Sequence, residues 1–447
     1  MDINKNTYQA YSLFNFKKIP QIKRLSEREM FDIEVVSQVL PFKTNSYVVN
    51  ELINWDNIPN DPIFILTFPQ KEMLLPEHYE TIANLLKKGA NKKEISKVAN
   101  DIRLQLNPHP AGQLDLNVPS IDGERINGMQ HKYRETVLFF PAQGQTCHAY
   151  CTFCFRWPQF VGMDDMKFAS KEADLMVRYI KEHKEVTNIL FTGGDPMVMK
   201  ARLLEQYINP LIENDLPQLK AIRIGTKALA YWPYRFTSDP DSKDILKLFE
   251  KITKSGKNIS VMAHFNHPVE LRTKAVKEAI WLIRSTGATI RTQSPLLKHI
   301  NADSETWEIM WREQVRLGCI PYYMFLARDT GAQHYFNISL EEAYHTFRNA
   351  YLNVSGLCRT VRGPSMSASP GKIQVLGITE IMGEKVYMLR FIQGRVSDWV
   401  GKPFFAKYKK DAVWLSDLKP AFGEEKFFWQ EEYETLTQEK IEAFLCM

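Results

Sequence analysis

The sequence predicts an α/β fold: a partial (β/α)6-type barrel, preceded by a helical N-terminal region and followed by a small C-terminal α+β extension. From about residue 135, short apolar runs of β-forming residues alternate with amphipathic helical stretches. Six strand-then-helix units in a row favour a parallel sheet with helices outside it. An open doubly wound sheet is the alternative. In both folds the functional groups lie at the carboxyl ends of the strands.

The elements follow in order along the chain. Residues 1–110 have a charged, helical pattern, clearest over 76–106, and the Pro- and Gly-rich segment 107–123 predicts an extended connector. The predicted strands are 136–142, 187–193, 221–226, 258–265, 288–294 and 321–327. The predicted helices include 170–183, 241–254, 269–286 and 303–317. Residues 354–400 favour loops and antiparallel strands, and the chain ends in an amphipathic helix, a packing or dimer element. We therefore predict three regions: 1–110, 111–352 and 353–447.

Composition narrows the class of protein. The 447 residues include 57 Lys and Arg and 52 Asp and Glu, and the net charge of +5 is spread along the chain, so nucleic acid is not the expected partner. No apolar run approaches the roughly 20 residues needed to span a membrane. The first 18 residues lack the apolar core of a secretory signal. Six cysteines do not make a disulfide scaffold, and we expect a cytoplasmic protein.

The segment 146–157 places three cysteines, Cys147, Cys151 and Cys154, in a C-x3-C-x2-C pattern directly after the first predicted strand. No second C-x2-C pair follows, as most zinc sites would need. Three thiolates suit an iron–sulfur cubane that keeps one iron open for a small molecule. The alternatives are a zinc site completed by His148 or a distant residue, and a chance cluster. Four aromatic residues would shield the metal from water: Tyr150, Phe153, Phe155 and Trp157.

Other polar motifs also follow predicted strands. Gly193, Gly194 and Asp195 come after the second, where glycines let the backbone approach a ligand closely; an ordinary turn is the alternative. The further candidates are His264 and Asn266 after the fourth strand, Gln293 and Ser294 after the fifth, and Arg328 after the sixth. A polar barrel rim would explain these residues without a ligand. The isolated Cys319, Cys358 and Cys446 are expected to be small buried hydrophobic residues.

Taken together, these stretches resemble the lysine 2,3-aminomutase family of radical S-adenosylmethionine (SAM) enzymes. The resemblance extends over roughly residues 100–380. The matching stretches are "HKY" (131–133), "CFR" (154–156), "GGDP" (193–196), "RIGTKALAYWPYRF" (223–236), "HFNHP" (264–268), "QSPLLKHIN" (293–301), "PYY" (321–323) and "SASPGK" (367–372).

The resemblance implies that the three cysteines bind a 4Fe–4S cluster whose open iron is chelated by SAM. One electron, from a donor such as flavodoxin or ferredoxin, would cleave SAM to a 5′-deoxyadenosyl radical. Gly193, Gly194 and Asp195 would approach the SAM amino group. The remaining cofactor-cavity residues implied are His264, Asn266, Gln293 and Ser294.

The family also uses pyridoxal 5′-phosphate (PLP), and Lys372 matches the lysine that holds it. Lys132 and Tyr133 lie in the stretch that binds the PLP phosphate. Where the family has two arginines, this chain has Lys132 and Thr136, with Arg134 between them. Lysine offers charge without the bidentate fork of arginine. Only Pro370 and Gly371 stand in place of the longer glycine run that usually precedes the lysine.

Arg156 matches the family arginine that binds the substrate α-carboxylate, so Arg156 and Lys372 are the expected catalytic residues. Lysine-specific members have two aspartates around the far ammonium group, whereas this chain has Arg328, beside Asp329, and Ala368. We therefore predict a 2,3-aminomutase for an acidic or neutral amino acid. The alternatives are a PLP-independent radical SAM enzyme and a metal-binding protein without catalysis. The C-terminal three-cysteine zinc cluster of some members is missing, so no zinc is expected. The chain is expected to act on a small molecule, as a monomer or a homo-oligomer.

Overall fold

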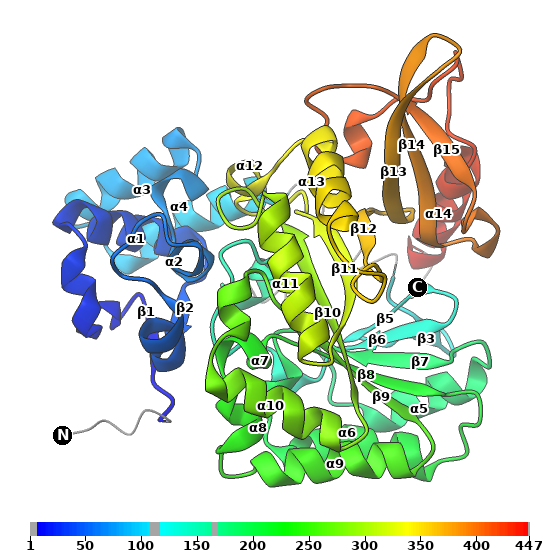
Figure 1. The fold of residues 1–447 in the computed structure, drawn as a ribbon, viewed down its shortest axis with the longest axis horizontal. Helices are drawn as coiled ribbons and strands as arrows, with labels where there is room; N and C mark the ends of the chain where they lie inside the picture. The colour runs from blue at the N-terminus through cyan, green and yellow to red at the C-terminus, as the bar shows by residue number, and fades with distance from the viewer. Residues whose placement is uncertain (1–6, 108–116, 162–167, 446–447) are drawn as a thin grey trace.

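The computed structural model describes residues 7–107, 117–161 and 168–445, and one long sheet dominates them (Figure 1). From one edge to the other its strands are β15 (Pro403–Lys407), β14 (Glu384–Gly394), β13 (Gly371–Ile381), β12 (Arg362–Ser367), β11 (Ile320–Leu326), β10 (Thr289–Leu296), β9 (Asn258–His264), β8 (Ala221–Thr226), β7 (Asn188–Phe191), β6 (Thr136–Phe139) and β5 (Met129–Tyr133).

The six predicted barrel strands, β6 to β11, are all present, and each runs parallel to its neighbours. Their order in the sheet is their order along the chain, so each crossover moves in the same direction. A doubly wound sheet would reverse that order at a switch point. The predicted α/β partial barrel is therefore confirmed, and β5 and β15 lie at the two open edges of the sheet.

Helices cover the outside of these strands (Figure 1). Four of them match predicted helices within a few residues: α5 (Ala173–Glu182), α9 (Ser242–Lys254), α10 (Lys274–Ser285) and α11 (Ser304–Arg316). Two were not singled out from the sequence, α6 (Ala201–Glu213) and α13 (Leu340–Leu352). Proline is atypical of a helix interior, so Pro210 obscures the helical pattern of this segment in the sequence. The helix nevertheless continues past Pro210 to Glu213.

The alternation of side chains along β8 shows which face looks into the barrel. Ile222, Ile224 and Thr226 are buried against the helices, while Ala221, Arg223 and Gly225 are half-buried on the other face. Successive side chains of a strand point to opposite faces of the sheet, so Arg223 faces the lumen. A large basic side chain in this position is unusual for a barrel interior, which apolar residues ordinarily fill.

The edges of the sheet differ from the prediction. The "HKY" stretch lies in β5, which pairs antiparallel with β6 and had not been predicted as a strand. β12 runs parallel to β11 and also pairs with β13, so the sheet continues across the predicted boundary at residues 352 and 353. The three-region division stays a prediction. The expected antiparallel extension and terminal helix are present as β13, β14, β15 and α14 (Gln430–Leu445).

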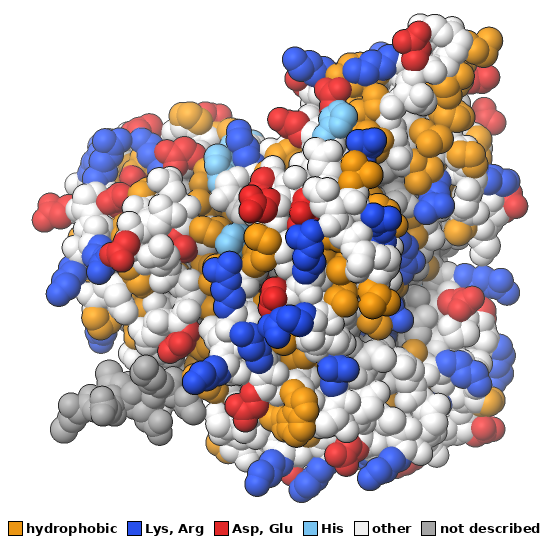
Figure 2. Space-filling model, in the orientation of Figure 1, with side chains coloured by type: hydrophobic (Ala, Val, Ile, Leu, Met, Phe, Trp, Pro, Cys, Tyr) orange, Lys and Arg blue, Asp and Glu red, His pale blue; other side chains and the backbone are white. Residues whose placement is uncertain are grey.

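The N-terminal region is mainly helical, with α1 (Glu27–Val39), α2 (Pro62–Thr67), α3 (Pro76–Lys87) and α4 (Lys92–Gln105). A two-stranded sheet of β1 (Ala10–Ser12) and β2 (Lys43–Asn45) was not predicted. Most of the predicted connector 107–123 lies outside the described residues. Within the described ranges, no helix is long and apolar enough to cross a membrane. Figure 2 shows acidic and basic side chains mixed over one face of the molecule.

Candidate active site

The cysteine loop follows β6 and folds into tight turns. The Cys154 N–H donates to the Cys151 carbonyl at 3.0 Å, and the Trp157 N–H donates to the Cys154 carbonyl at 3.2 Å. Burial raises the pKa of all three thiols, and thiolate repulsion raises the pKa of Cys147 and Cys154 further. Three thiols that repel one another in a buried place suit a cationic group that accepts thiolates.

Cys151 also contacts the barrel, since its thiol donates to the Tyr231 hydroxyl at 3.6 Å. Among the described residues, no three His, Cys, Asp or Glu groups lie in an arrangement that would hold a single metal ion. A cubane binds each thiolate to a different iron, which needs wider spacing than one ion does. The donor set therefore fits a 4Fe–4S cluster. Cys319 and Cys358 are buried as predicted, and Cys446 lies outside the described residues.

Residues from the N-terminal region hold the cysteine loop from the other side. Lys43 Nζ donates to the Cys147 carbonyl at 2.7 Å, and the Tyr150 N–H donates to the Lys43 carbonyl at 2.7 Å. Asn45 Nδ2 donates to the His148 carbonyl at 3.1 Å. The sequence analysis missed this role, because nothing in the local pattern of residues 43–45 points to a segment about a hundred positions away.

The glycine motif after β7 packs directly on the cysteine loop. A Cβ at Gly194 would lie 2.5 Å from the Thr146 nitrogen and 2.4 Å from its oxygen. The Asp195 carboxylate is buried and accepts hydrogen bonds from the Met197 N–H, the Thr226 hydroxyl and the Lys227 N–H. Close packing on Thr146 therefore explains the glycine at position 194, and the three hydrogen bonds explain the aspartate at position 195. The predicted approach of this motif to the SAM amino group stays a prediction.

Gly194→Ala should lower the iron content of the reconstituted protein severalfold, because the added methyl group displaces the loop that carries Cys147. Overpacking of this kind costs about 1–3 kcal/mol. Iron per chain, measured after anaerobic reconstitution, checks this expectation. The matched control is Gly225→Ala, where a Cβ meets nothing closer than 3.6 Å and iron binding should persist. Equal iron content in the two variants would contradict the prediction.

The structure brings together the polar residues at the ends of β9 and β10. Asn266 is fully buried, accepts from Lys227 Nζ at 2.7 Å and donates to the Ser294 hydroxyl at 2.9 Å. Lys227 also forms a buried ion pair with Glu270, at 2.7 Å. Sequence reasoning missed this pair, although both residues lie in or next to the motifs that it singled out. The pair fixes the rim of the barrel.

His264 and Gln293 pair in register on neighbouring strands, and both side chains are half-buried. Burial, together with the charge of Lys227, lowers the pKa of His264 to about 3. The imidazole is therefore neutral at neutral pH. The predicted cofactor contacts of His264, Asn266, Gln293 and Ser294 stay predictions.

Arg156 and Arg328 lie on the same aromatic ring. Each guanidinium is 5.0 Å from the centre of the Phe155 ring, so Phe155 contacts both arginines, and its predicted shielding of the cysteines stays a prediction. Arg156 Nη1 and Arg328 Nε are buried and have no hydrogen-bond partner among the described residues. Burial lowers the pKa of both, that of Arg156 to about 10. Two buried guanidiniums with unused N–H donors suit anionic groups.

Lys372 lies at the start of β13, and its ammonium group is 4.1 Å from the centre of the Tyr323 ring. Burial, followed by the charges of Arg223 and Arg362, lowers its pKa to about 7. An amine of which about half is neutral near pH 7 is a nucleophile suited to an aldehyde cofactor. Lys372 therefore suits PLP in two ways: its position in the sequence matches the family lysine, and its lowered pKa favours the reactive amine.

The segment before Lys372 is held by two cations. Lys132 Nζ donates to the Ala368 carbonyl at 2.5 Å, and Arg395 Nε donates to the Ser369 carbonyl at 2.9 Å. Arg395 was missed from the sequence, because only the pairing of β13 with β14 brings it here. Burial lowers the pKa of Lys132 well below the ordinary lysine value.

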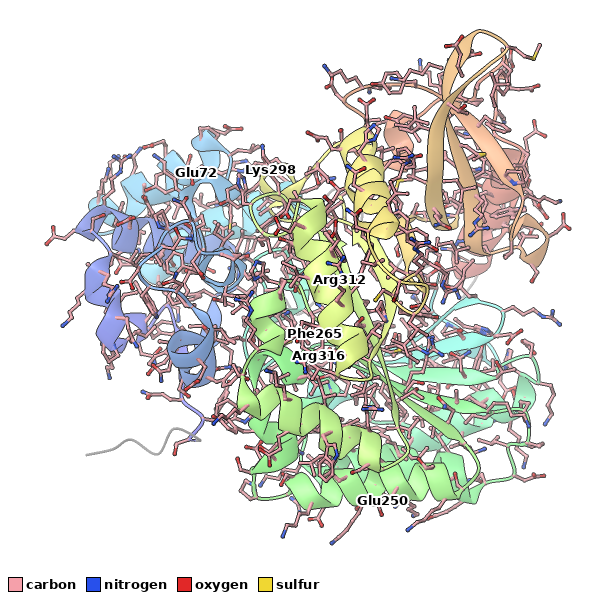
Figure 3. The ribbon with its side chains drawn as sticks, viewed as in Figure 1. Glu72, Glu250, Phe265, Lys298, Arg312 and Arg316 are labelled. Atoms are coloured by element: carbon pink, nitrogen blue, oxygen red, sulfur yellow. The ribbon has the colours of Figure 1, made fainter. Side chains whose placement is uncertain are left out.

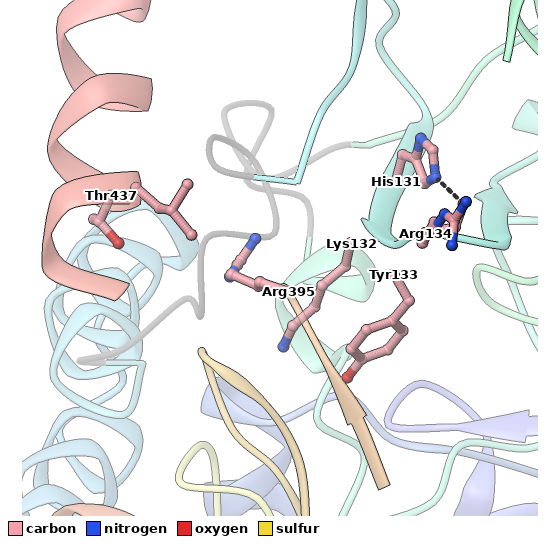
Figure 4. Close-up of a pocket in the computed structure, with 7 residues that line it drawn as sticks. His131, Lys132, Tyr133, Arg134, Arg395 and Thr437 are labelled. Atoms are coloured by element: carbon pink, nitrogen blue, oxygen red, sulfur yellow. Dashed lines mark hydrogen bonds between the residues drawn. The ribbon is translucent and has the colours of Figure 1, made fainter. Parts of the chain in front are cut away.

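Lys132, Tyr133 and Arg395 also line a pocket of about 210 Å³ between β5 and α14 (Figure 4). Arg134 is exposed beside it, and its carbonyl lies 3.0 Å from His131 Nε2. Thr136, the other residue at an arginine position of the family, donates instead to Asn188 on β7 at 3.2 Å. Lys132 and Thr136, which stand at the two positions where the family binds the PLP phosphate, therefore contact other groups of the protein.

Comparison with known proteins follows this geometry. No family model matches the chain. An Aquifex aeolicus protein named "Putative L-lysine 2,3-aminomutase" is 33% identical over 406 residues, 91% of this chain and 95% of its own length. A glutamate 2,3-aminomutase of Clostridioides difficile is 27% identical and covers 58% of each chain. Among solved structures, a radical SAM methyltransferase from Sphaerobacter thermophilus is 14% identical with a TM-score of 0.38, covering 65% of this chain and 94% of that one.

The parallel barrel, the three-cysteine loop and these sequence relatives together define an enzyme of the radical SAM isomerase class. The chain belongs to the lysine 2,3-aminomutase family. The resemblance seen in the sequence is thus confirmed.

Proposed function

We propose that this enzyme is a 2,3-aminomutase that moves the amino group of an acidic or neutral amino acid from the α to the β carbon. One observation carries the choice of substrate: Arg328 lies beside Arg156, and both keep buried N–H donors without acceptors among the described residues. Arg156 would hold the α-carboxylate, and Arg328 would face the side chain. A cationic side chain brought next to Arg328 would be repelled.

The cysteines would hold a 4Fe–4S cluster, which together with SAM supplies hydrogen-atom abstraction. The chain contributes the surroundings of that chemistry. Tyr231 contacts the Cys151 sulfur, and the charge of Lys43 offsets part of the rise that burial causes in the pKa of the Cys147 thiol. A cation next to one thiolate and a hydroxyl next to another both stabilise the charged sulfur that iron requires.

PLP, when bound, carries the migrating amino group and stabilises the radical. Lys372 would hold the cofactor covalently. The Tyr323 and Phe325 rings, 4.1 and 5.2 Å from its ammonium group, position this side chain and exclude water. Lys132 and Arg395 fix the carbonyls of the preceding segment, so that the lysine enters the barrel in one place.

The experiment that tests this function is anaerobic reconstitution with iron, sulfide, PLP and SAM, followed by a panel of amino acids read by NMR. Glutamate, aspartate or a neutral amino acid should give a β-amino product. Lysine should be at least about 100-fold slower, because an uncompensated buried charge costs about 3–5 kcal/mol. Arg328→Asp should reverse this order.

Arg312→Asp is the matched control for that variant. Arg312 lies on the outer helix α11 and pairs with Glu308 at the surface, so its loss should leave the substrate order unchanged. Turnover of lysine by the unaltered enzyme at least as fast as of every other amino acid would overturn the proposed substrate class.

A further inference from the structure

A second set of arginines occupies the barrel lumen next to Lys372. Arg223 comes from β8, Arg291 from β10 and Arg362 from the first position of β12. Their side chains are half-buried, and the charges of Arg291 and Arg362 both lower the pKa of Arg223. Alternate strands of a barrel place inward side chains in a common layer, which brings these three residues from separate segments to one place.

Two of these arginines, Arg291 and Arg362, lie against the rings of Tyr322 and Tyr323. The guanidinium of Arg362 is 4.3 Å from the centre of the Tyr322 ring, and that of Arg291 is 5.2 Å from it. Arg362 also lies 4.6 Å from the centre of the Tyr323 ring. Stacking on aromatic faces holds a guanidinium in place while leaving its N–H donors available at the edges.

None of the three arginines forms a side-chain hydrogen bond or an ion pair with the residues that the structure describes, and the buried Arg223 Nε has no partner there. Two arginines on the outer helix α11, Arg312 and Arg316, differ in this respect (Figure 3). Arg312 pairs with Glu308, and Arg316 pairs with Glu313. Gathering three permanent charges without an acceptor is costly unless an anion joins them. The unpaired donors and charges of this layer therefore suit an anion.

We propose that Arg223, Arg291 and Arg362 bind a phosphate group in the barrel lumen, and that in this enzyme the group is the phosphate of PLP. The identification as PLP rests on the proposed function. Three guanidiniums from three strands suit a tetrahedral dianion, whereas one fork suffices for a carboxylate. The position also fits, because Arg362 and Lys372 lie 4.6 and 4.1 Å from the centre of the same Tyr323 ring. A single small molecule can therefore reach both residues.

The competing position is the pocket that Lys132 and Arg395 line. There some of the donors are already used: Lys132 Nζ donates to the Ala368 carbonyl, and Arg395 donates to the Ser369 carbonyl and to Asn117 Oδ1. Those residues hold the segment that leads to Lys372. The phosphate is accordingly assigned to the lumen side of Lys372 rather than to the "HKY" stretch.

The test compares the binding of PLP with that of pyridoxal, which lacks the phosphate, by absorbance on the full-length reconstituted protein. Arg223→Gln and Arg362→Gln should each weaken PLP binding at least about tenfold, because each removes a charge-assisted contact to phosphate. Pyridoxal binding should stay unchanged, which also shows that the variants fold. Lys132→Gln and the surface variant Arg312→Gln should keep the PLP-to-pyridoxal ratio of the unaltered protein.

An unchanged ratio in Arg223→Gln and Arg362→Gln, or a ratio lost in Lys132→Gln instead, would overturn the assignment. A second measurement separates this site from the proposed function. Inorganic phosphate, followed by calorimetry, should bind the unaltered protein and not Arg362→Gln. PLP could fail to bind while phosphate binds the unaltered protein and not Arg362→Gln. That result would contradict the PLP-dependent function and would support the anion site. If phosphate binds both proteins equally, the site falls.

Discussion

Replacing Cys147, Cys151 or Cys154 with alanine should abolish both the iron–sulfur absorption band and the cleavage of SAM. Each thiolate binds a different iron of the cubane, so no other cysteine replaces it. The other cysteines among the described residues, Cys319 and Cys358, are both buried. Cys319 directly precedes β11, and the Cys358 thiol donates to the Trp311 carbonyl at 3.8 Å. Iron and sulfide per chain, and 5′-deoxyadenosine released from SAM under reduction, are the two measurements.

Cys319→Ala and Cys358→Ala are matched controls, since both remove a buried sulfur without touching the cysteine loop. They should keep about four irons per chain, the content of one cubane, and full SAM cleavage. Full cleavage in any of the three loop variants would sink the cluster assignment. A protein with intact iron but no cleavage in its unaltered form would instead favour the non-catalytic metal-binding alternative.

Lys372→Ala should abolish covalent attachment of PLP and all amino migration, while iron content and SAM cleavage persist. Lys372 lies on β13, and its ammonium group is close to the Tyr323 and Phe325 rings of β11 rather than to the described part of the cysteine loop. Borohydride reduction followed by peptide mass analysis should find a pyridoxyl group on Lys372 in the unaltered enzyme. Lys251→Ala is the control, because Lys251 lies on the outer helix α9 and pairs with Glu213 at the surface.

The attachment of PLP should also depend on pH. Because the pKa of Lys372 is lowered to about 7, the reactive neutral amine is scarce below that value and predominates above it. The rate of attachment should rise between about pH 6 and pH 8 and then level off; an ordinary lysine would continue to gain up to its pKa of about 10.4. A rate that keeps rising past pH 9 would contradict the buried position of Lys372.

Two other outcomes discriminate between the remaining functions. A pyridoxyl group on a different lysine would keep the aminomutase but show that "SASPGK" was aligned wrongly. No trapped group after PLP is added, with SAM cleavage intact, would favour the PLP-independent radical SAM enzyme. The separate contacts of Lys132 and Thr136 are the structural reason to make this test early.

Much of the barrel could be predicted because its signals are local. Each strand is a short apolar run, each helix repeats with its own period, and the C-x3-C-x2-C spacing lies within one loop. Elements that lack a local signal were missed. Pro210 obscures the helical pattern of α6, and β5 becomes a strand only because β6 offers it hydrogen bonds.

The sequence by itself determined the class of protein and the three-cysteine motif, and it predicted a role for the lysine at residue 372, because these depend on residue types at fixed spacings. Only the tertiary structure decided how the site is assembled. It places Lys43 on the Cys147 carbonyl, Arg156 and Arg328 on the Phe155 ring, and two arginines of separate strands on the Tyr322 ring. Such contacts join residues about a hundred positions or more apart, or depend on which face of a strand looks inward. Burial among these neighbours sets the protonation of Lys372 and leaves the arginines without acceptors, so the chemistry of the site follows from packing that no short stretch of sequence encodes.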